Sequence, residues 1–276
     1  MPFRVEPDPS LKDALAGTDR PLAGIWVCSG SPLVAEICAG AGFDWLFIDA
    51  EHSPNGPASV LAQLQAVRGY PVVPVVRPPA NDPVLIKQYL DVGAQTLIVP
   101  MVNTAGEARA AAAAVRYPPH GIRGVGSALA RSARWNRIPD YLQRASETIT
   151  LIVQIESAQA VANAAGIAAV DGVDGVFIGP SDLAASMGVI GQQAHPDVVA
   201  NVEATIAAVK AAGKYVGVNA FAEPEARRYM AAGADFVGLG ADVALLARGT
   251  EALAARFTGD PATDGSGSAG NAPASY

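Results

Sequence analysis

The sequence predicts a single (β/α)8 TIM barrel, and three observations lead to this fold class. Apolar, strand-like segments alternate with helical patterns eight times along the chain. At four of these junctions a helix ends at glycine and a short strand rich in β-branched and aromatic residues follows. A chain of 276 residues, 50% of them apolar, is also close to the usual size of one such barrel. A doubly wound open sheet is the alternative, but it would usually have fewer units or a second domain.

Each expected element follows from its local pattern. The strands carry the β-branched and aromatic residues typical of buried parallel strands, and the helices end at glycines that suit a left-handed closing position, such as Gly93 and Gly233. In chain order, the strands are expected at 22–29, 40–49, 71–78, 92–100, 149–156, 172–180, 214–221 and 232–240. The helices are expected at roughly 31–40, 57–69, 82–92, 104–116, 157–169, 197–212, 223–233 and 242–257.

The barrel accounts for residues 21–258, and the remaining segments have different compositions. Residues 1–20 are expected to be a lead segment, and residues 259–276, rich in Gly, Ser, Ala and Pro, a disordered tail outside the fold. Between the fourth helix and the fifth strand, residues 117–145 form an unusually long connection. Such connections are commonly lids or subunit contacts.

Composition and charge exclude several function classes. A net charge of −7 and a pI near 4.9 argue against nucleic acid and anionic membranes as partners. The only cysteines, Cys28 and Cys38, lie in apolar contexts and are expected to be free thiols, which fits a reducing cytoplasm. The N-terminus lacks the pattern of a secretory signal, and no apolar stretch reaches the length of a membrane span.

Polar residues capable of chemistry follow the ends of four predicted strands. They are Asp49, Glu51 and His52, then Arg77, Glu156 and Asp182. The carboxyl ends of barrel strands converge on one face, so we expect these side chains to form one active site.

Glu156 and Asp182 are the candidate metal ligands. Either acid alone could instead stabilise the first turn of the helix that follows it. Together on adjacent strands they favour Mg²⁺ or Mn²⁺, which complete their shells with water and substrate oxygens. Zinc is less favoured because no cluster of histidine or cysteine accompanies the two acids.

His52 and Arg77 are the candidate base and the candidate enolate-binding cation. A neutral imidazole beside two acids can act as a general base near neutral pH, although a structural role is the alternative. A buried arginine requires an anionic partner, which is either a nearby carboxylate or the substrate. None of the four lysines falls at a predicted strand end, so a Schiff-base aldolase is disfavoured.

Over residues 24–257 the chain resembles the HpcH/HpaI-type class II pyruvate aldolases, also called the HpcH/HpaI aldolase/citrate lyase group, and within it the bacterial 4-hydroxy-2-oxoheptane-1,7-dioate aldolases. The resemblance is carried by GFDWLFIDAEH, VVRPPANDPVLIKQYLDVGAQTLIVPMV, RYPPHGIRGVGSALARSARWNRIPDYLQ and GVDGVFIGPSDL. It implies reversible cleavage of 4-hydroxy-2-oxo acids into pyruvate and an aldehyde such as succinate semialdehyde, with Mg²⁺, Mn²⁺ or Co²⁺ as cofactor. It also implies a homohexamer in which the last helix packs on, or is swapped with, that of a partner subunit. The alternatives are an acyl-CoA lyase of the citrate lyase/malyl-CoA group and a non-catalytic barrel that only binds ligands.

The resemblance also implies roles for single residues. Asp91 matches an acid that raises the basicity of the catalytic histidine, but it lies late on a predicted helix. We therefore expect it to reach a histidine only in a neighbouring subunit or through a water molecule. The other matches are Asp49 and His52 as the acid–histidine pair with His52 as base, Arg77 as the enolate-stabilising cation, Glu156 and Asp182 as metal ligands, and Gln154, the Ser181 backbone, Trp26 and Asn219 as substrate-binding positions.

Two positions depart from the pattern of the family. Ser181 stands where relatives often carry alanine, and Asn219 stands where they often carry an apolar residue, leucine in the most similar type. Both changes add polarity near the methyl group of the donor, where these groups would lack hydrogen-bond partners. We therefore predict that hydroxypyruvate is accepted as a donor better than by relatives with leucine.

Overall fold

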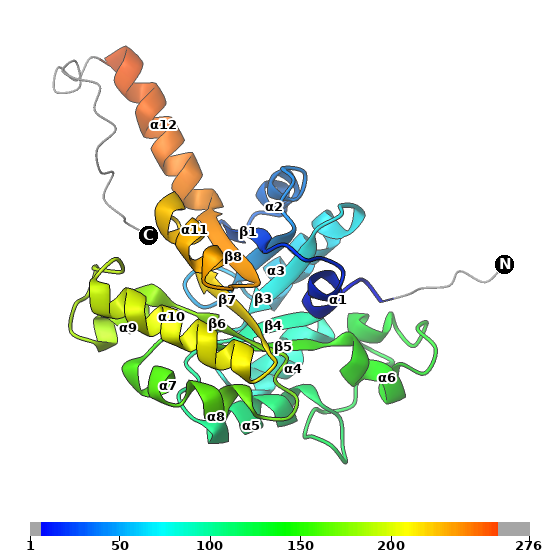
Figure 1. Ribbon diagram of the computed structural model, residues 1–276. Helices are drawn as coiled ribbons and strands as arrows, with labels where there is room; N and C mark the ends of the chain where they lie inside the picture. The colour runs from blue at the N-terminus through cyan, green and yellow to red at the C-terminus, as the bar shows by residue number, and fades with distance from the viewer. Residues whose placement is uncertain (1–6, 259–276) are drawn as a thin grey trace.

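The computed structural model describes residues 7–258, in which eight parallel strands form a closed barrel surrounded by helices (Figure 1). The strands are β1 (Leu22–Val27), β2 (Trp45–Asp49), β3 (Val73–Arg77), β4 (Thr96–Val99), β5 (Thr150–Ile155), β6 (Gly175–Ile178), β7 (Tyr215–Asn219) and β8 (Phe236–Ala241). Each strand pairs with the next in sequence, and β8 pairs with β1. The predicted single (β/α)8 barrel is confirmed.

The helices form the outer layer of this barrel. They are α1 (Leu11–Ala16), α2 (Pro32–Ala39), α3 (Pro57–Ala66), α4 (Pro83–Asp91), α5 (Ala105–Val115), α6 (Tyr141–Thr148), α7 (Ala158–Ala162), α8 (Ala164–Ala168), α9 (Pro180–Ser186), α10 (Pro196–Ala211), α11 (Glu223–Ala231) and α12 (Asp242–Thr258). Short 3₁₀ turns lie at Val67–Gly69 and Arg131–Ala133. Gly93 and Gly233 have φ angles of +108° and +105°, so they take the left-handed conformation expected after their helices. Within residues 7–258, no helix combines the length and apolar character needed to cross a membrane.

Aromatic rings fill the inside of the barrel. Trp45, Phe47, Phe177 and Phe236 are fully buried there. The centroids of contacting rings among these four lie 5.4–6.3 Å apart. Glycine makes room for them, because a Cβ added at Gly24 would lie 2.1 Å from the Trp45 ring. A separate aliphatic cluster packs between the strands and the outer helices. The barrel is therefore a solid support for residues at the strand ends.

Helix α1 closes the amino-terminal end of the barrel and was not expected within the lead segment. Leu11 is fully buried, and its backbone N–H donates to Oγ1 of Thr96 at the start of β4 (3.0 Å). Nζ of Lys12 donates to the carbonyl of Ile149, next to the start of β5 (3.0 Å). Six residues are too few to show a helical period, so the sequence pattern could not reveal this element. The predicted tail at 259–276 lies outside the described residues.

The long connection at 117–145 lies at this same amino-terminal end. It joins the end of α5 to the start of β5, and its side chains Ala133, Ile138, Tyr141 and Ala145 form a small core of their own. The expectation that this segment forms a lid over the carboxyl-terminal mouth of the same barrel is therefore wrong. The other expectation, a contact with another subunit, stays a prediction.

Candidate active site

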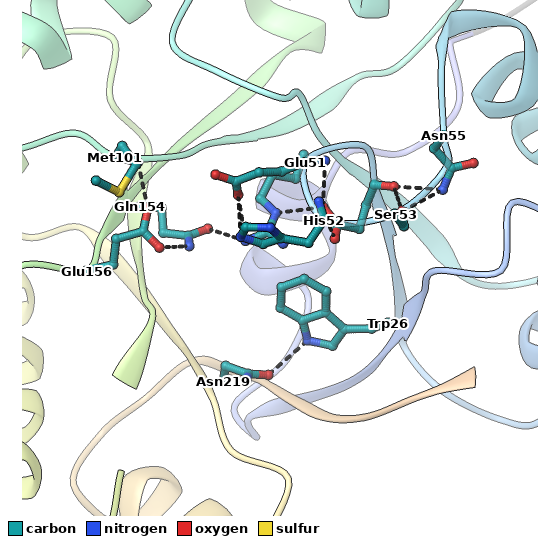
Figure 2. Close-up of polar contacts among 11 residues, drawn as sticks. Trp26, Glu51, His52, Ser53, Asn55, Met101, Gln154, Glu156 and Asn219 are labelled. Atoms are coloured by element: carbon teal, nitrogen blue, oxygen red, sulfur yellow. Dashed lines mark hydrogen bonds and ion pairs between the residues drawn. The ribbon is translucent and has the colours of Figure 1, made fainter. Parts of the chain in front are cut away.

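The predicted site residues other than Asp91 converge at the carboxyl-terminal mouth of the barrel, around a pocket of about 450 Å³. In Figure 2, Gln154 and Glu156 face Glu51 and His52, with Trp26 and Asn219 alongside. The predicted residues that line the pocket are Trp26, Asp49, His52, Arg77, Gln154, Ser181, Asp182 and Asn219. Glu156 lies buried behind this lining, and Asp91 lies elsewhere in the fold.

Arg77 is a buried cation at the floor of the pocket. It ends β3 directly opposite Asp49 at the end of β2, and its Nε donates to Oδ1 of Asp49 at 2.8 Å. The guanidinium carbon lies 4.5 Å from the centroid of the Trp26 ring, a cation–π contact. Burial disfavours the charged form, but the hydrogen bond to Asp49 and the neighbouring carboxylates raise the pKa of Arg77 above its usual value. The position of this positive charge is thus fixed before substrate arrives.

Glu51 connects this cation to the candidate base. Its Oε2 lies 2.9 Å from Nη1 of Arg77 and 3.9 Å from Nε2 of His52, yet among residues 7–258 no donor is aligned to give it a hydrogen bond. Burial raises the pKa of Glu51 to about 7; Arg77 opposes this shift, whereas Asp49 and Asp182 add to it. The sequence places Glu51 as one of the two acids beside the candidate base. Its half-buried side chain, with Oε2 shielded from solvent, makes it part of the site.

Asp49 fixes the chain that presents His52. Its carboxylate accepts hydrogen bonds from the backbone N–H groups of Glu51 (3.0 Å) and His52 (3.2 Å) as well as from Arg77. The His52 side chain is 59% exposed and lines the pocket. Asp49 therefore positions the base through the backbone, and the acid beside the imidazole is Glu51.

Glu156, directly after β5, is held by a backbone donor beyond the end of β4 and by a side-chain donor on β5. Its Oε1 accepts a 2.7 Å hydrogen bond from the N–H of Met101, a residue with a φ of 55°, and its Oε2 accepts one from the Gln154 amide (Figure 2). A Cβ at Gly179 would lie 3.1 Å from Oε2, so glycine there leaves space for the carboxylate. Burial raises the pKa of Glu156 to about 7; the two hydrogen bonds oppose this rise, while Glu51 and Asp182 contribute to it.

The donor set fits a hard divalent cation. Asp182 lies in the first turn of α9, near enough to Glu51 and Glu156 to raise the pKa of both. A bound cation would offset this repulsion between neighbouring carboxylates. Within the described part of the chain, no group of three or more His, Cys, Asp or Glu side chains has the spacing of a complete metal site. The protein would therefore supply two carboxylates, and substrate and water the remaining ligands.

Asn219 and Ser181, the two positions that depart from the family pattern, already have hydrogen-bond partners. Oδ1 of Asn219 accepts a 2.9 Å hydrogen bond from the indole N–H of Trp26, and Oγ of Ser181 accepts one from Gln193 (3.0 Å). The expectation that both groups would lack partners beside a methyl group is therefore wrong. The bond from Trp26 nevertheless fixes the amide plane of Asn219, whose N–H₂ remains as the donor group at this wall.

Comparison with known proteins identifies the family. The family model described as HpcH/HpaI aldolase/citrate lyase matches residues 22–249. The chain belongs to this family. It is 58% identical over 248 residues to the 4-hydroxy-2-oxo-heptane-1,7-dioate aldolase of Salmonella paratyphi C, covering 90% of this chain and 94% of that protein. The expected class, a carbon–carbon lyase, is thereby confirmed.

Solved structures share the fold of this chain. A HpcH/HpaI aldolase/citrate lyase family protein from Burkholderia cenocepacia is 42% identical, with a TM-score of 0.85 and coverage of 90% of this chain and 98% of that one. The citrate lyase beta subunit of M. tuberculosis, solved with oxaloacetate and magnesium, shares the fold at 19% identity and a TM-score of 0.54, with 80% and 92% coverage.

Asp91 is the predicted HpcH/HpaI site residue that the structure does not bring to the pocket. It ends α4 at the opposite side of the barrel, and its Oδ1 accepts a 2.8 Å hydrogen bond from the fully buried guanidinium of Arg123. A role at a histidine of a neighbouring subunit stays a prediction.

Covalent catalysis by a lysine or a cysteine nucleophile is disfavoured at this mouth. Among the described residues lining the pocket none is lysine, in agreement with the argument against Schiff-base chemistry. Cys28 does line the pocket, but burial, together with Asp49 and Asp242, raises its pKa to about 12. Its thiol therefore stays protonated and unreactive near neutral pH.

Sequence reasoning missed the part of the pocket lined by α12. Val243, Ala244, Ala247 and Arg248 form this wall. Their spacing of one and four residues could have indicated a common helix face, but nothing in the sequence showed that the face turns to the mouth.

Proposed function

We propose that this chain is a divalent-metal-dependent class II aldolase that reversibly cleaves 4-hydroxy-2-oxo acids into pyruvate and an aldehyde. The observation that carries the proposal is the placement of Glu156 and Asp182 at the same mouth as Arg77, with His52 beside them. The name of the Salmonella relative supports 4-hydroxy-2-oxoheptane-1,7-dioate as substrate, which would give succinate semialdehyde as the aldehyde.

Glu156 and Asp182, through a bound ion, and the side-chain amide of Gln154 would bind the 2-oxo acid end of the substrate. Glu156 and Asp182 would hold the ion, with Mg²⁺, Mn²⁺ and Co²⁺ as candidates. When bound, the ion would supply Lewis-acid stabilisation of negative charge on the keto oxygen. Gln154 and the backbone N–H of Ser181, in the first turn of α9, would orient the substrate carboxylate.

His52 and Arg77 would carry the bond-breaking step. The imidazole takes the proton of the C4 hydroxyl, the C3–C4 bond breaks, and the aldehyde leaves. The electron pair of that bond becomes the pyruvate enolate, whose negative charge Arg77 stabilises until a proton is returned to C3. Glu51, whose Oε2 lies 3.9 Å from Nε2 of His52, would face the ring while it carries the transferred proton.

The pocket favours this function over an acyl-CoA lyase. A cavity of about 450 Å³ suits a short-chain acid, and its cations are the buried Arg77 and one arginine on α12. A nucleotide-sized ligand would need a wider basic surface. A barrel that only binds ligands is disfavoured because base, cation and both carboxylates are all present.

We propose further that a second copy of the chain covers α12, as part of a homohexamer in the cytoplasm. This helix extends away from the barrel (Figure 1), with Leu245, Leu246 and Phe257 at 62%, 64% and 82% exposure. An amphipathic helix left in water would lose the stabilisation of its apolar face. Light scattering after size exclusion should give six subunits, and Leu246→Glu should yield a smaller species.

The test of the proposed function is pyruvate release from 4-hydroxy-2-oxoheptane-1,7-dioate, followed with lactate dehydrogenase and NADH. Activity should disappear in excess EDTA and return when Mg²⁺ or Mn²⁺ is added beyond the chelator. Borohydride added together with pyruvate should leave the enzyme active, because no imine forms. Full activity in excess chelator would show that the proposed function is wrong.

A further inference from the structure

The pocket changes in character from its floor to its rim. Its floor carries the charged and amide groups of Asp49, Arg77 and Gln154. Above them, Phe221, Val243, Ala244 and Ala247 form an apolar wall, and Arg248 follows on the helix. A ligand spanning this pocket would therefore meet polar groups first, then an apolar stretch, then a cation.

Helix α12 is anchored so that Arg248 stays near the rim. Asp242, at the start of the helix, is 5% exposed, and its carboxylate accepts the backbone N–H groups of Cys28 (2.8 Å) and Ser29 (3.1 Å) after β1. Arg248 is six residues further on, about 9 Å along the helix axis. The four wall residues, Val243, Ala244, Ala247 and Arg248, share one face because they are one and four positions apart.

Arg248 is the pocket cation that can exchange its partner. Among the described lining residues the arginines are Arg77 and Arg248, and Arg77 is already paired with Asp49 and Glu51. Arg248 pairs with Glu251 at 2.7 Å, but the two side chains are 67% and 60% exposed. An ion pair so exposed contributes little, so a ligand carboxylate can replace Glu251 at small cost.

We propose that Arg248 selects substrates whose aldehyde portion ends in a carboxylate, with a short methylene chain lying along the apolar wall. This inference rests on the proposed aldolase function and specifies its substrate class. The reacting carbons would lie beside His52 and Arg77, and the distal carboxylate would displace Glu251 from Arg248. The 1,7-dioate in the name of the Salmonella relative has such a second carboxylate.

The experiment compares two substrates that differ only at the distal end: 4-hydroxy-2-oxoheptane-1,7-dioate and 4-hydroxy-2-oxoheptanoate. The measured quantity is the ratio of their kcat/KM values, since the neutral tail reports any loss common to both. Arg248→Ala should lower this ratio about fivefold, which is the upper end for an ion pair at an exposed site. The change should lie mainly in KM, because the distal carboxylate does not take part in bond breaking.

Further variants separate recognition from a structural effect. Arg248→Glu should lower the ratio more than Arg248→Ala, whereas Glu251→Gln should raise it by removing the competing carboxylate. Arg256→Ala is the matched control, because Arg256 is an exposed arginine two turns further along α12 and outside the pocket lining. It should leave the ratio at the wild-type value.

A ratio within twofold of wild type in Arg248→Ala would overturn the inference. A lower ratio in Arg248→Glu but not in Arg248→Ala would overturn it as well. That result would show only that the new glutamate repels the distal carboxylate, and not that Arg248 binds it. The proposed function would survive either result if wild-type enzyme still released pyruvate from both substrates in a metal-dependent way. Loss of the function itself would instead appear as no pyruvate from either substrate.

Discussion

Replacing Arg77 with alanine removes a buried cation from between two acids and from the site of enolate formation. Arg77 is 3% exposed, its Nε lies 2.8 Å from Asp49 and its Nη1 2.9 Å from Glu51. Breaking a buried ion pair costs about 3–5 kcal/mol because the remaining charge is uncompensated. We expect the substitution to lower the unfolding free energy by about 3 kcal/mol, the low end of this range. The cost is limited because Glu51, whose pKa is about 7, can take up a proton and lose its charge.

The same change removes the stabilisation of the enolate. Loss of one preorganised donor to a developing oxyanion lowers kcat by about 10²–10³. Urea unfolding gives the stability, and the lactate dehydrogenase assay gives kcat and KM at a urea-free, fully folded state. Arg77→Lys is the control, because it keeps the charge but not the planar fork, and it should recover more of the stability than of the rate.

The stability deficit of Arg77→Ala should depend on pH with a definite sign. Without the cation, the folded-state pKa of Glu51, which burial already raises to about 7, rises further above its unfolded value. Acids with raised pKa values stabilise the fold below the unfolded pKa, and this contribution is lost as pH rises through the folded pKa. The deficit should therefore grow between pH 5 and pH 8. Wild-type kcat together with unchanged stability would refute the placement of Arg77 at the centre of the site.

Three further predictions concern the base, the metal and the donor pocket. His52→Ala should slow aldol cleavage while partly sparing exchange of the pyruvate methyl protons in D₂O, measured by NMR; equal losses in both reactions would contradict a role specific to the C4 hydroxyl. Apparent Mn²⁺ affinity should fall about tenfold from pH 8 to pH 6. Burial raises the pKa of Glu156 to about 7, and its carboxyl group must lose its proton to bind metal. Calorimetry that shows a pH-independent affinity would contradict this. Asn219→Leu should shift the hydroxypyruvate-to-pyruvate ratio of catalytic efficiencies towards pyruvate by a factor equivalent to about 1 kcal/mol, the value of one neutral hydrogen bond, and an unchanged ratio would show that the amide does not face the donor.

The barrel and its mouth could be predicted because local sequence encodes them. The alternation of strand and helix patterns fixes the fold, and the strand ends of a barrel share one face, so Asp49, Arg77 and Glu156 could be grouped without coordinates. Whether an acid contacts a ring or a backbone N–H depends on side-chain direction, which sequence spacing does not give. The expected pairing of Asp49 with His52 is therefore a contact with the backbone N–H of His52 and not with its imidazole.

Features that depend on packing between distant segments were not predictable. The partners of Asn219 and Ser181 lie 193 and 12 residues away in sequence, so their hydrogen bonds could not be anticipated. Helix α1 is too short to show a period, and the direction of α12 is set by buried contacts of Asp242. The wall that α12 contributes to the pocket followed only from the structure.

Parallel measurement of Mn²⁺ binding and pyruvate release in Glu156→Ala and Asp182→Ala tests the central claim most directly. Asp171→Ala is the control, because Asp171 is 91% exposed, pairs with Arg116 and lies outside the pocket lining. We expect both site variants to lose metal binding and turnover together, since one carboxylate does not hold an ion of this class against water, and the control to keep both. Tight Mn²⁺ binding or wild-type pyruvate release in either site variant would contradict the account.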